Sequence, residues 1–276
     1  MTTLKGNLRK LEAKLDQNKV EYRLRLYDVL EKQEQSIDLN ACVGKDIRIG
    51  FTNQIHCVAT GKKIKKAYGE GFSWEAFESS PMADPSIMKP ELSTAHLGIA
   101  RRDLEWEIRN HVTPHFVYLS YTSGFKVGVT RATQIPTRWI DQGAVLALKL
   151  AKTPHRADAG NIEVALKDFV ADKTNWRKML SLQCIDNQKI IDLKNELKAK
   201  IPIEFQGLIL EEETPQILEF PVISYPEKVK SLKLDKVPVI EKKLVGIKGQ
   251  YLMFDDHSVI NLRSHSGYEI EFEASI

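Results

Sequence analysis

Three side chains in the middle of the chain could together break a phosphodiester bond. Tyr118 lies in a strand-like run, Arg138 follows a proline, and Glu163 lies in an amphipathic stretch. Hydrolysis of a phosphodiester needs a group that deprotonates water, a cation that meets the charge developing on the phosphate, and a carboxylate that holds a metal ion. A tyrosine, an arginine and a glutamate supply one group of each kind.

Each of these residues also has a purely structural interpretation. A tyrosine in a strand is usually packed in or near a core. Glu163 precedes Lys167 by four residues, which suits an exposed ion pair on a helix. Arg138 could stack on Trp139 or pair with a surface carboxylate such as Asp141, but Pro136 fixes the turn that presents it, which favours a functional role. For Tyr118 and Glu163 both interpretations stay open.

A β-hairpin and two helices are predicted to position these side chains. Residues 116–121 and 125–130 are rich in β-branched and aromatic residues and are joined by Thr-Ser-Gly, which is typical of a hairpin. A helical pattern follows over residues 139–152, and a second one over residues 160–171. The expected order over about residues 115–185 is therefore strand, strand, helix, helix.

Two further helices are expected after this module. Asp172 is placed to accept hydrogen bonds from the first turn of a short helix over residues 174–180. Residues 186–201 form an amphipathic pattern that Pro202 ends.

The parts of the chain on either side of this module are predicted to be rich in strands and loops rather than helices. Together with the module they predict an α+β fold. The predicted division is a β unit over 1–60, a loop-rich connector over 61–114, the α/β module with its following helix over 115–200, and a β segment over 201–276. We expect the two terminal β segments to join into one domain, because chain termini often lie near each other.

The order of these motifs resembles that of the GIY-YIG nuclease superfamily. The hairpin motifs of that superfamily correspond to FVYL and KVG here, and VTR follows the second one. In the superfamily an arginine on the first helix and a glutamate on a later helix follow the hairpin, as Arg138 and Glu163 do. The first motif here lacks the glycine, and Lys126 stands where many members carry tyrosine.

This resemblance implies a role for each site residue. Tyr118 would assist the base, Arg138 would clamp the scissile phosphate with its fork of donors, and Glu163 would bind Mg²⁺ or Mn²⁺. DNA or RNA is the implied partner. The residues expected to contact it are Lys126, Gly128, Thr130, Arg131 and Gln134.

Longer strings resemble a bacterial domain family without an assigned activity. They are KVGVTRATQIPTRWIDQGA, AGNIEVALKDFVADKTNWRKML and VGIKGQYLMFD, so this resemblance spans nearly the whole chain. Members look like a β-rich cytoplasmic frame around a GIY-YIG-like centre. The resemblance therefore implies a fold but no particular reaction.

Relatives of this kind commonly carry a zinc ribbon of two Cys-x2-Cys pairs ahead of the module. The corresponding positions here are Cys57, Thr60, Ser73 and Ala76. Because a tetrahedral Zn²⁺ site needs about four nitrogen or sulfur ligands, zinc is not expected. We expect Phe72, Trp74 and Phe77 to pack in its place.

The cysteines, charges and hydropathy bound the remaining possibilities. Cys42, Cys57 and Cys184 are far apart and predict buried free thiols rather than disulfides. Residues 115–185 hold 10 Lys and Arg against 5 Asp and Glu, which gives this segment a charge of +5. The rest of the chain has a charge of −2, so the whole chain has a net charge of +3. No apolar stretch suits a membrane span or a secretory leader, so a cytoplasmic protein is expected.

Three functions fit this sequence, and whether the protein is an enzyme stays open. The first is a metal-dependent nuclease, the second a non-catalytic nucleic-acid or nucleotide-binding protein, and the third a protein-interaction scaffold. A solvent-facing cluster of Tyr118, Arg138 and Glu163 would favour the first. A buried Tyr118 with Glu163 turned away would favour the other two.

Overall fold

The computed structural model describes residues 2–171, 173–181, 185–211 and 213–275. It divides into two compact units, one formed by Met1–Glu78 with Glu219–Ile276 and the other by Ser79–Leu218. Strands and helices are mixed in the chain, as the expected α+β class requires. The predictions made for Asp172 and Cys184 lie outside the described residues.

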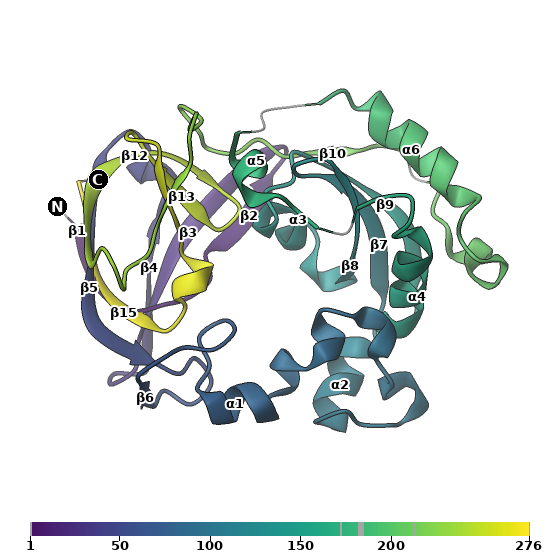
Figure 1. The fold of residues 1–276 in the computed structure, drawn as a ribbon, viewed down its shortest axis with the longest axis horizontal. Coiled ribbons are helices and arrows are strands. Elements are labelled where there is room, and N and C mark those ends of the chain that lie inside the picture. The colour runs from purple at the N-terminus through teal and green to yellow at the C-terminus, as the bar shows by residue number, and fades with distance from the viewer. Residues whose placement is uncertain (1, 172, 182–184, 212, 276) are drawn as a thin grey trace. The chain divides into compact units, whose positions relative to one another are not determined.

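The first unit is built on a large curled sheet (Figure 1). Its strand order is β11-β14-β13-β12-β5-β15-β1-β3-β2, with β4 paired to β3 and β6 paired to β5. The strands are β1 (Thr2–Leu8), β2 (Glu12–Asp16), β3 (Lys19–Asp28), β4 (Gln33–Asp38), β5 (Asp46–His56), β6 (Lys63–Ile64), β11 (Lys230–Leu232), β12 (Val239–Lys248), β13 (Tyr251–Phe254), β14 (Ser258–Asn261) and β15 (Tyr268–Ala274). The short helices of this unit are η1 (Asn40–Cys42), α1 (Trp74–Ser79) and η8 (Arg263–His265).

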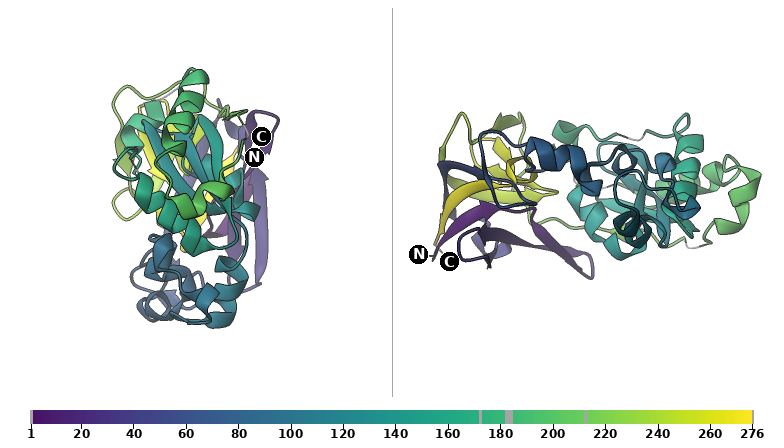
Figure 2. Two further views of the ribbon diagram at one scale, coloured as in Figure 1. Left: turned by 90° about the vertical axis from the view of Figure 1, so that its right-hand side faces the viewer. Right: turned by 90° about the horizontal axis from the view of Figure 1, so that it is seen from below.

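Segments from both ends of the chain share this sheet. β1 pairs antiparallel with β15 from Thr2 opposite Ala274 to Asn7 opposite Glu269. Buried and partly exposed residues alternate along β15, because only one face of the sheet meets the core. The two termini consequently lie beside each other (Figure 2).

The second unit contains a small antiparallel sheet with the order β10-β9-β7-β8. The predicted hairpin is confirmed, since β7 (His115–Tyr121) pairs with β8 (Phe125–Arg131). β9 (Leu146–Thr153) lies on the other side of β7, and β10 (Gln216–Ile217) forms the edge. The helices are α2 (Leu104–His111), α3 (Thr137–Asp141), α4 (Arg156–Leu166), α5 (Trp176–Ser181) and α6 (Gln188–Lys198), with 3-10 turns η6 (Ala132–Gln134) and η7 (Ile203–Leu208).

The helix predicted over residues 139–152 is wrong. α3 ends at Asp141, and Gly143 follows with a φ of +68°, a left-handed conformation that a glycine adopts without strain. β9 then begins at Leu146 and is buried along most of its length. A short, continuously apolar run is compatible with a buried strand as well as a buried helix, so periodicity could not separate them. The order of the module is strand, strand, helix, strand, helix.

One face of the small sheet packs on helices and forms the core of this unit. Val117, Leu119 and Val127 lie on that face together with Ile162 of α4 and Ile190 of α6. α6 corresponds to the amphipathic helix predicted over 186–201. Because side chains alternate along a strand, Tyr118 lies on the opposite face of the sheet from Val117 and Leu119.

The segment between the first strands and the hairpin is a series of short turns. It contains η2 (Pro81–Ala83), η3 (Pro85–Ile87), η4 (Pro90–Leu92), η5 (Ala95–Leu97) and then α2. Three of these turns begin with a proline, whose fixed φ suits a first helical position and whose missing N–H is not needed there.

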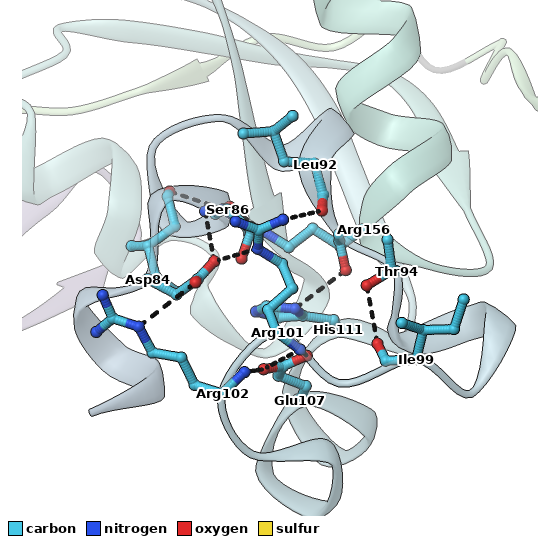
Figure 3. Close-up of polar contacts among 12 residues, drawn as sticks. Asp84, Ser86, Leu92, Thr94, Ile99, Arg101, Arg102, Glu107, His111 and Arg156 are labelled. Atoms are coloured by element: carbon cyan, nitrogen blue, oxygen red, sulfur yellow. Dashed lines mark hydrogen bonds and ion pairs between the residues drawn. The ribbon is translucent and has the colours of Figure 1, made fainter. Parts of the chain in front are cut away.

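Buried charges hold this segment together (Figure 3). Asp84 Oδ1 accepts hydrogen bonds from the backbone N of Ser86 at 2.8 Å and from Arg101 Nε at 2.7 Å. Burial acts to raise the pKa of Asp84, but these two donors outweigh it and lower the pKa. Glu107 accepts hydrogen bonds from the backbone N of Arg101 and of Arg102. The segment is thus fixed by paired charges rather than by a large apolar core.

Within the described residues, no helix is both long and apolar enough to cross a membrane.

Candidate functional site in the Ser79–Leu218 unit

Tyr118 lies in the middle of β7 with 0% of its surface exposed. It is paired with Gly128 in β8 and with Lys149 in β9. A Cβ atom added to Gly128 would lie 2.7 Å from both the Cζ and the hydroxyl oxygen of Tyr118. Gly128, which is expected from the sequence to contact nucleic acid, therefore makes room for the tyrosine ring. That ring also meets Trp139 edge to face, with the ring centres 6.0 Å apart.

The Tyr118 hydroxyl is hydrogen-bonded to the side chain of Gln142 at 2.9 Å. With the amide oriented to satisfy all its neighbours, Gln142 Nε2 donates to Tyr118, and Gln142 Oε1 accepts from Arg138 Nε at 3.2 Å and from Arg138 Nη2 at 3.3 Å. Arg138 and Gln142 are four residues apart, so one turn of α3 and its C-cap presents both. Two of the predicted catalytic residues are thus brought together, through a glutamine that the sequence did not single out.

The environment of Tyr118 keeps its hydroxyl protonated. Burial raises the pKa of Tyr118, Arg138 acts to lower it, and the negative charge of Glu163 raises it further, with a net pKa above the ordinary value. A general base at neutral pH needs a pKa near 7. Tyr118 therefore stays neutral and suits holding Gln142 in place better than proton abstraction.

Glu163 lies half-buried on α4, where charges of both signs act on it. Burial raises the pKa of Glu163, while the ammonium groups of Lys167 and Lys126 lower it. Tyr118 also lies close enough for the charge of Glu163 to raise the tyrosine pKa. Glu163 therefore belongs to the surroundings of the tyrosine without being hydrogen-bonded to it in the described structure.

A second carboxylate, Glu91, lies near Glu163. Its turn η4 packs tightly on α4, since a Cβ atom on Gly160 would lie 2.1 Å from the backbone N of Glu91. The negative charge of Glu91 raises the pKa of Glu163. In the described structure Glu91 Oε2 is buried and has no hydrogen-bond partner.

Three arginines surround these groups, and none of them pairs with a carboxylate among the described residues. Arg138 is bonded to Gln142, Arg131 Nη1 donates to the side chain of Asn110, and Arg156 donates to backbone carbonyls. Burial lowers the pKa of Arg156 to about 10, and the positive charges of Arg138 and Arg131 add to this effect. The carboxylates of Glu163 and Glu91 act on the pKa of Arg156 in the opposite direction, so charges of both signs lie around this guanidinium group.

Arg156 has a further, structural role. It is the first residue of α4, and it donates to the carbonyl of Ser86 at 2.9 Å and to that of Ile87 at 2.8 Å (Figure 3). α4 is thereby tied to η3, the turn that precedes the one carrying Glu91.

The remaining predicted contacts occupy β8 and the turn after it. Lys126 and Thr130 are buried in β8, and Lys126 lies near Glu163. Arg131 is the last residue of that strand, and Gln134 lies half-buried in η6. Of these residues, Lys126 and Arg131 share the surroundings of Tyr118, Arg138 and Glu163 through their charges.

The residues at the positions of the zinc-ribbon cysteines lie in the unit formed by residues 1–78 and 219–276. The backbone N of Ser73 donates to Cys57 Sγ at 3.2 Å. Burial acts to raise the pKa of Cys57, but hydrogen bonds from Thr60 and Ser73 outweigh it and lower the pKa to about 7. Phe72 and Ala76 pack on Cys57. The prediction of buried free thiols is confirmed for Cys42 and Cys57.

The residues around Tyr118 do not form a ready-made metal centre. Across the part of the chain that the structure describes, no group of three or more His, Cys, Asp or Glu is placed to hold a metal ion. Glu91 lies near enough to Glu163 for its charge to raise the pKa of Glu163, and Glu91 Oε2 has no hydrogen-bond partner in the described structure. Two carboxylates can be enough to bind Mg²⁺ where phosphate oxygens of a substrate complete the coordination shell of the metal ion.

The fold and the site define an α+β protein in which a small antiparallel sheet carries a buried tyrosine, Tyr118, that is linked through Gln142 to Arg138 on α3. The chain belongs to the family described as "Protein of unknown function (DUF2797)", whose model matches residues 44–270. This confirms the membership predicted from the long sequence strings, while the likeness to GIY-YIG nucleases stays a prediction. No match was found among curated proteins or among solved structures.

Proposed function

We propose that this chain is a nucleic-acid-binding protein that holds backbone phosphates at Arg138. The observation that supports the proposal most directly is the cluster of Arg131, Arg138 and Arg156, which has no carboxylate partner among the described residues. A guanidinium group without a carboxylate partner can give charge-assisted hydrogen bonds to the oxygens of a phosphate.

Arg138 is prepared for such a contact by its neighbours. Gln142 is neutral and receives two donors of the guanidinium group, which orients it without cancelling its charge. The remaining donors of this half-exposed side chain suit the oxygens of a phosphate. Tyr118 supports Gln142 from beneath and keeps its own proton.

The order of the elements supports nucleic acid as the source of the phosphate. Arg138 lies on the first helix after the hairpin and Glu163 on a later helix, as the resemblance to GIY-YIG nucleases implies. The surplus of +5 over residues 115–185 adds an attraction for polyanions in general.

Arg138→Gln should weaken binding of nucleic acid by about 10-fold or more, since a lost charge-assisted hydrogen bond is worth roughly 1.5 to 3 kcal/mol. The measurement is fluorescence anisotropy with labelled single- and double-stranded DNA and RNA at several salt concentrations. Arg109→Gln is the matched control, because Arg109 is an exposed arginine of the same unit that pairs with Glu105. Equal affinities for the two variants would refute the proposed contact.

Arg138→Lys separates charge from geometry. It keeps the positive charge but loses the fork, so it should recover only part of the affinity. Thermal unfolding of each variant checks that the loss of the contact with Gln142 has not disrupted the unit.

Metal-dependent cleavage of the bound strand is the second candidate function. It is favoured by the carboxylates of Glu163 and Glu91, of which Glu91 Oε2 has no partner in the described structure. These two residues would hold Mg²⁺ or Mn²⁺, which when bound lowers the pKa of a water molecule and neutralises charge on the phosphate. Arg138 would hold the phosphate, and Tyr118 would act through Gln142 as a positioning group rather than as the base.

Cleavage is tested by incubating the protein and labelled nucleic acid with Mg²⁺ or Mn²⁺. Tyr118→Phe should lower the rate only modestly, because the ring and its packing remain, whereas Glu163→Gln should abolish cleavage while leaving binding intact. If the wild-type protein leaves every substrate whole, the cleavage candidate is rejected and binding alone remains.

A further inference from the structure

An aromatic cluster with one exposed member, Trp74, lies between β6 and the end of α1, in the unit formed by residues 1–78 and 219–276. Tyr68, Trp74 and Phe77 form it, and we call it the aromatic platform. The ring of Tyr68 lies 5.0 Å from that of Trp74 and 6.4 Å from that of Phe77, and the rings of Trp74 and Phe77 are 6.2 Å apart. Trp74 packs on Phe77 as the sequence predicts, but 51% of its surface is exposed.

The underside of the platform is rigidly supported. Phe72 packs in a small core with Cys57 and Ala76, and Phe77 packs against that core. Tyr68 and Phe72 exchange two backbone hydrogen bonds of 2.9 Å each. A Cβ atom on Gly69 would lie 2.9 Å from the Phe77 ring, so the turn fits closely beneath it. Binding of a ligand on Trp74 therefore costs less conformational entropy than binding on a mobile loop would.

Four lysines precede the platform in the sequence GKKIKKAYG. Lys62, Lys63, Lys65 and Lys66 are all exposed. Lys66 Nζ lies 5.1 Å from the centre of the Tyr68 ring, which joins the lysines to the aromatic platform. In the described part of the chain none of the four forms an ion pair.

Acidic residues nearby reduce this positive charge only in part. Glu70 is paired with Arg263, and Glu75 and Glu78 are exposed on the short helix that carries Trp74. Four lysines against these two carboxylates leave a positive surplus around the aromatic platform.

An exposed tryptophan backed by two partly buried rings, beside four lysines without an ion pair, matches the chemistry of single-stranded nucleic acid. Every base has a face that can stack on an aromatic side chain, and the backbone phosphates attract ammonium groups. In a duplex the faces of the bases are already stacked on one another, so the rings would gain little. An acidic protein would meet the lysines but would leave the aromatic rings without a specific partner.

We propose that the aromatic platform and Lys62, Lys63, Lys65 and Lys66 bind single-stranded nucleic acid. A base stacks on Trp74 beside Tyr68, and the lysines contact the phosphates that flank it. This surface and the arginine cluster around Arg138 belong to different units of the protein, and the proposal does not depend on the one made for Arg138.

The test measures binding of the full chain to a labelled single-stranded oligonucleotide and to a duplex of the same length. Trp74→Ala should weaken single-strand binding by about 5- to 100-fold and leave duplex binding nearly unchanged. Trp74→Phe keeps a stacking surface and should recover much of the loss. Phe169→Ala is the matched control, because Phe169 is similarly exposed, at 54%, in the other unit.

The lysines are tested through the salt dependence of single-strand binding. Lys65→Gln with Lys66→Gln should lower the slope of log K against log salt concentration by about 1.4, at about 0.7 per phosphate contact. Lys14→Gln with Lys19→Gln removes two exposed lysines of the same unit and should leave the slope unchanged.

Three results would overturn the proposal. They are a Trp74→Ala variant that binds single strands like the wild type, equal weakening for single strands and duplexes, and complete competition by polyglutamate, which would indicate an acidic protein partner. A loss of affinity in Arg138→Gln with Trp74→Ala unaffected would support the arginine site alone, and the reverse would support the aromatic platform alone.

Discussion

The pairing of Gly128 with Tyr118 shows how one position in β8 controls the interior of the site. Because the Tyr118 ring occupies the space above Gly128, no side chain can be added there without displacing the ring. The Tyr118 hydroxyl would then move away from Gln142, which orients Arg138. A change in a buried glycine is thus transmitted to a half-exposed arginine through two side chains.

Gly128→Ala should destabilise the Ser79–Leu218 unit by about 1 to 3 kcal/mol, the usual cost of overpacking a core. The measurement is the free energy of unfolding from urea denaturation. Tyr118→Phe removes the hydroxyl oxygen that lies 2.7 Å from the added Cβ, so the double variant should recover part of the loss. If the two changes are simply additive, the ring and the glycine are not in the contact described here.

At the scale of the elements, helices and strands that depend on residues close together in the sequence could be predicted. Those that depend on packing against distant segments could not. The hairpin of β7 and β8 and the helix α6 follow from residues adjacent in the chain. The sequence of β9 predicts a helix as readily as a strand because it is apolar on both faces. Its pairing with β7 and β10 makes this segment a strand.

The same distinction holds for the candidate site. Tyr118, Arg138 and Glu163 could be picked out from their order along the chain. Gln142 was also within reach, because it lies four residues after Arg138 on one helix. Glu91 could not be found from sequence, since it approaches Glu163 only through the packing of η4 on α4 at Gly160.

The exposed Trp74 marks the limit of reasoning from residue type alone. The aromatic residues of this loop are predicted to pack together, and Trp74 does stack on Phe77, yet the short helix α1 presents Trp74 on the opposite side from the buried Ala76. A six-residue helix is too short for its periodicity to show which side chains are buried. The small core around Cys57 determines that Ala76 is buried and Trp74 is exposed.

At the scale of the whole molecule, a buried lysine links the stability of the first unit to pH. Lys248 ends β12 with 0% of its surface exposed, and its Nζ lies 5.3 Å from the Phe220 ring and 5.4 Å from the Tyr225 ring. Burial lowers the pKa of Lys248 from 10.5 to about 7. Between these two values the unfolded chain binds a proton that the folded unit does not bind.

Stability therefore rises with pH over this window. Above pH 10.5 the lysine is neutral in both states, and as the pH falls toward 7 the folded state loses up to about 4 kcal/mol relative to the unfolded chain. Urea unfolding from pH 7 to pH 9.5 should show this rise in the transition of the unit formed by residues 1–78 and 219–276. Lys248→Met, which fills the same space without a charge, should remove the slope and stabilise the unit most near pH 7, whereas Lys228→Met at an exposed position should change neither. A slope that persists in Lys248→Met would assign the pH dependence to other groups.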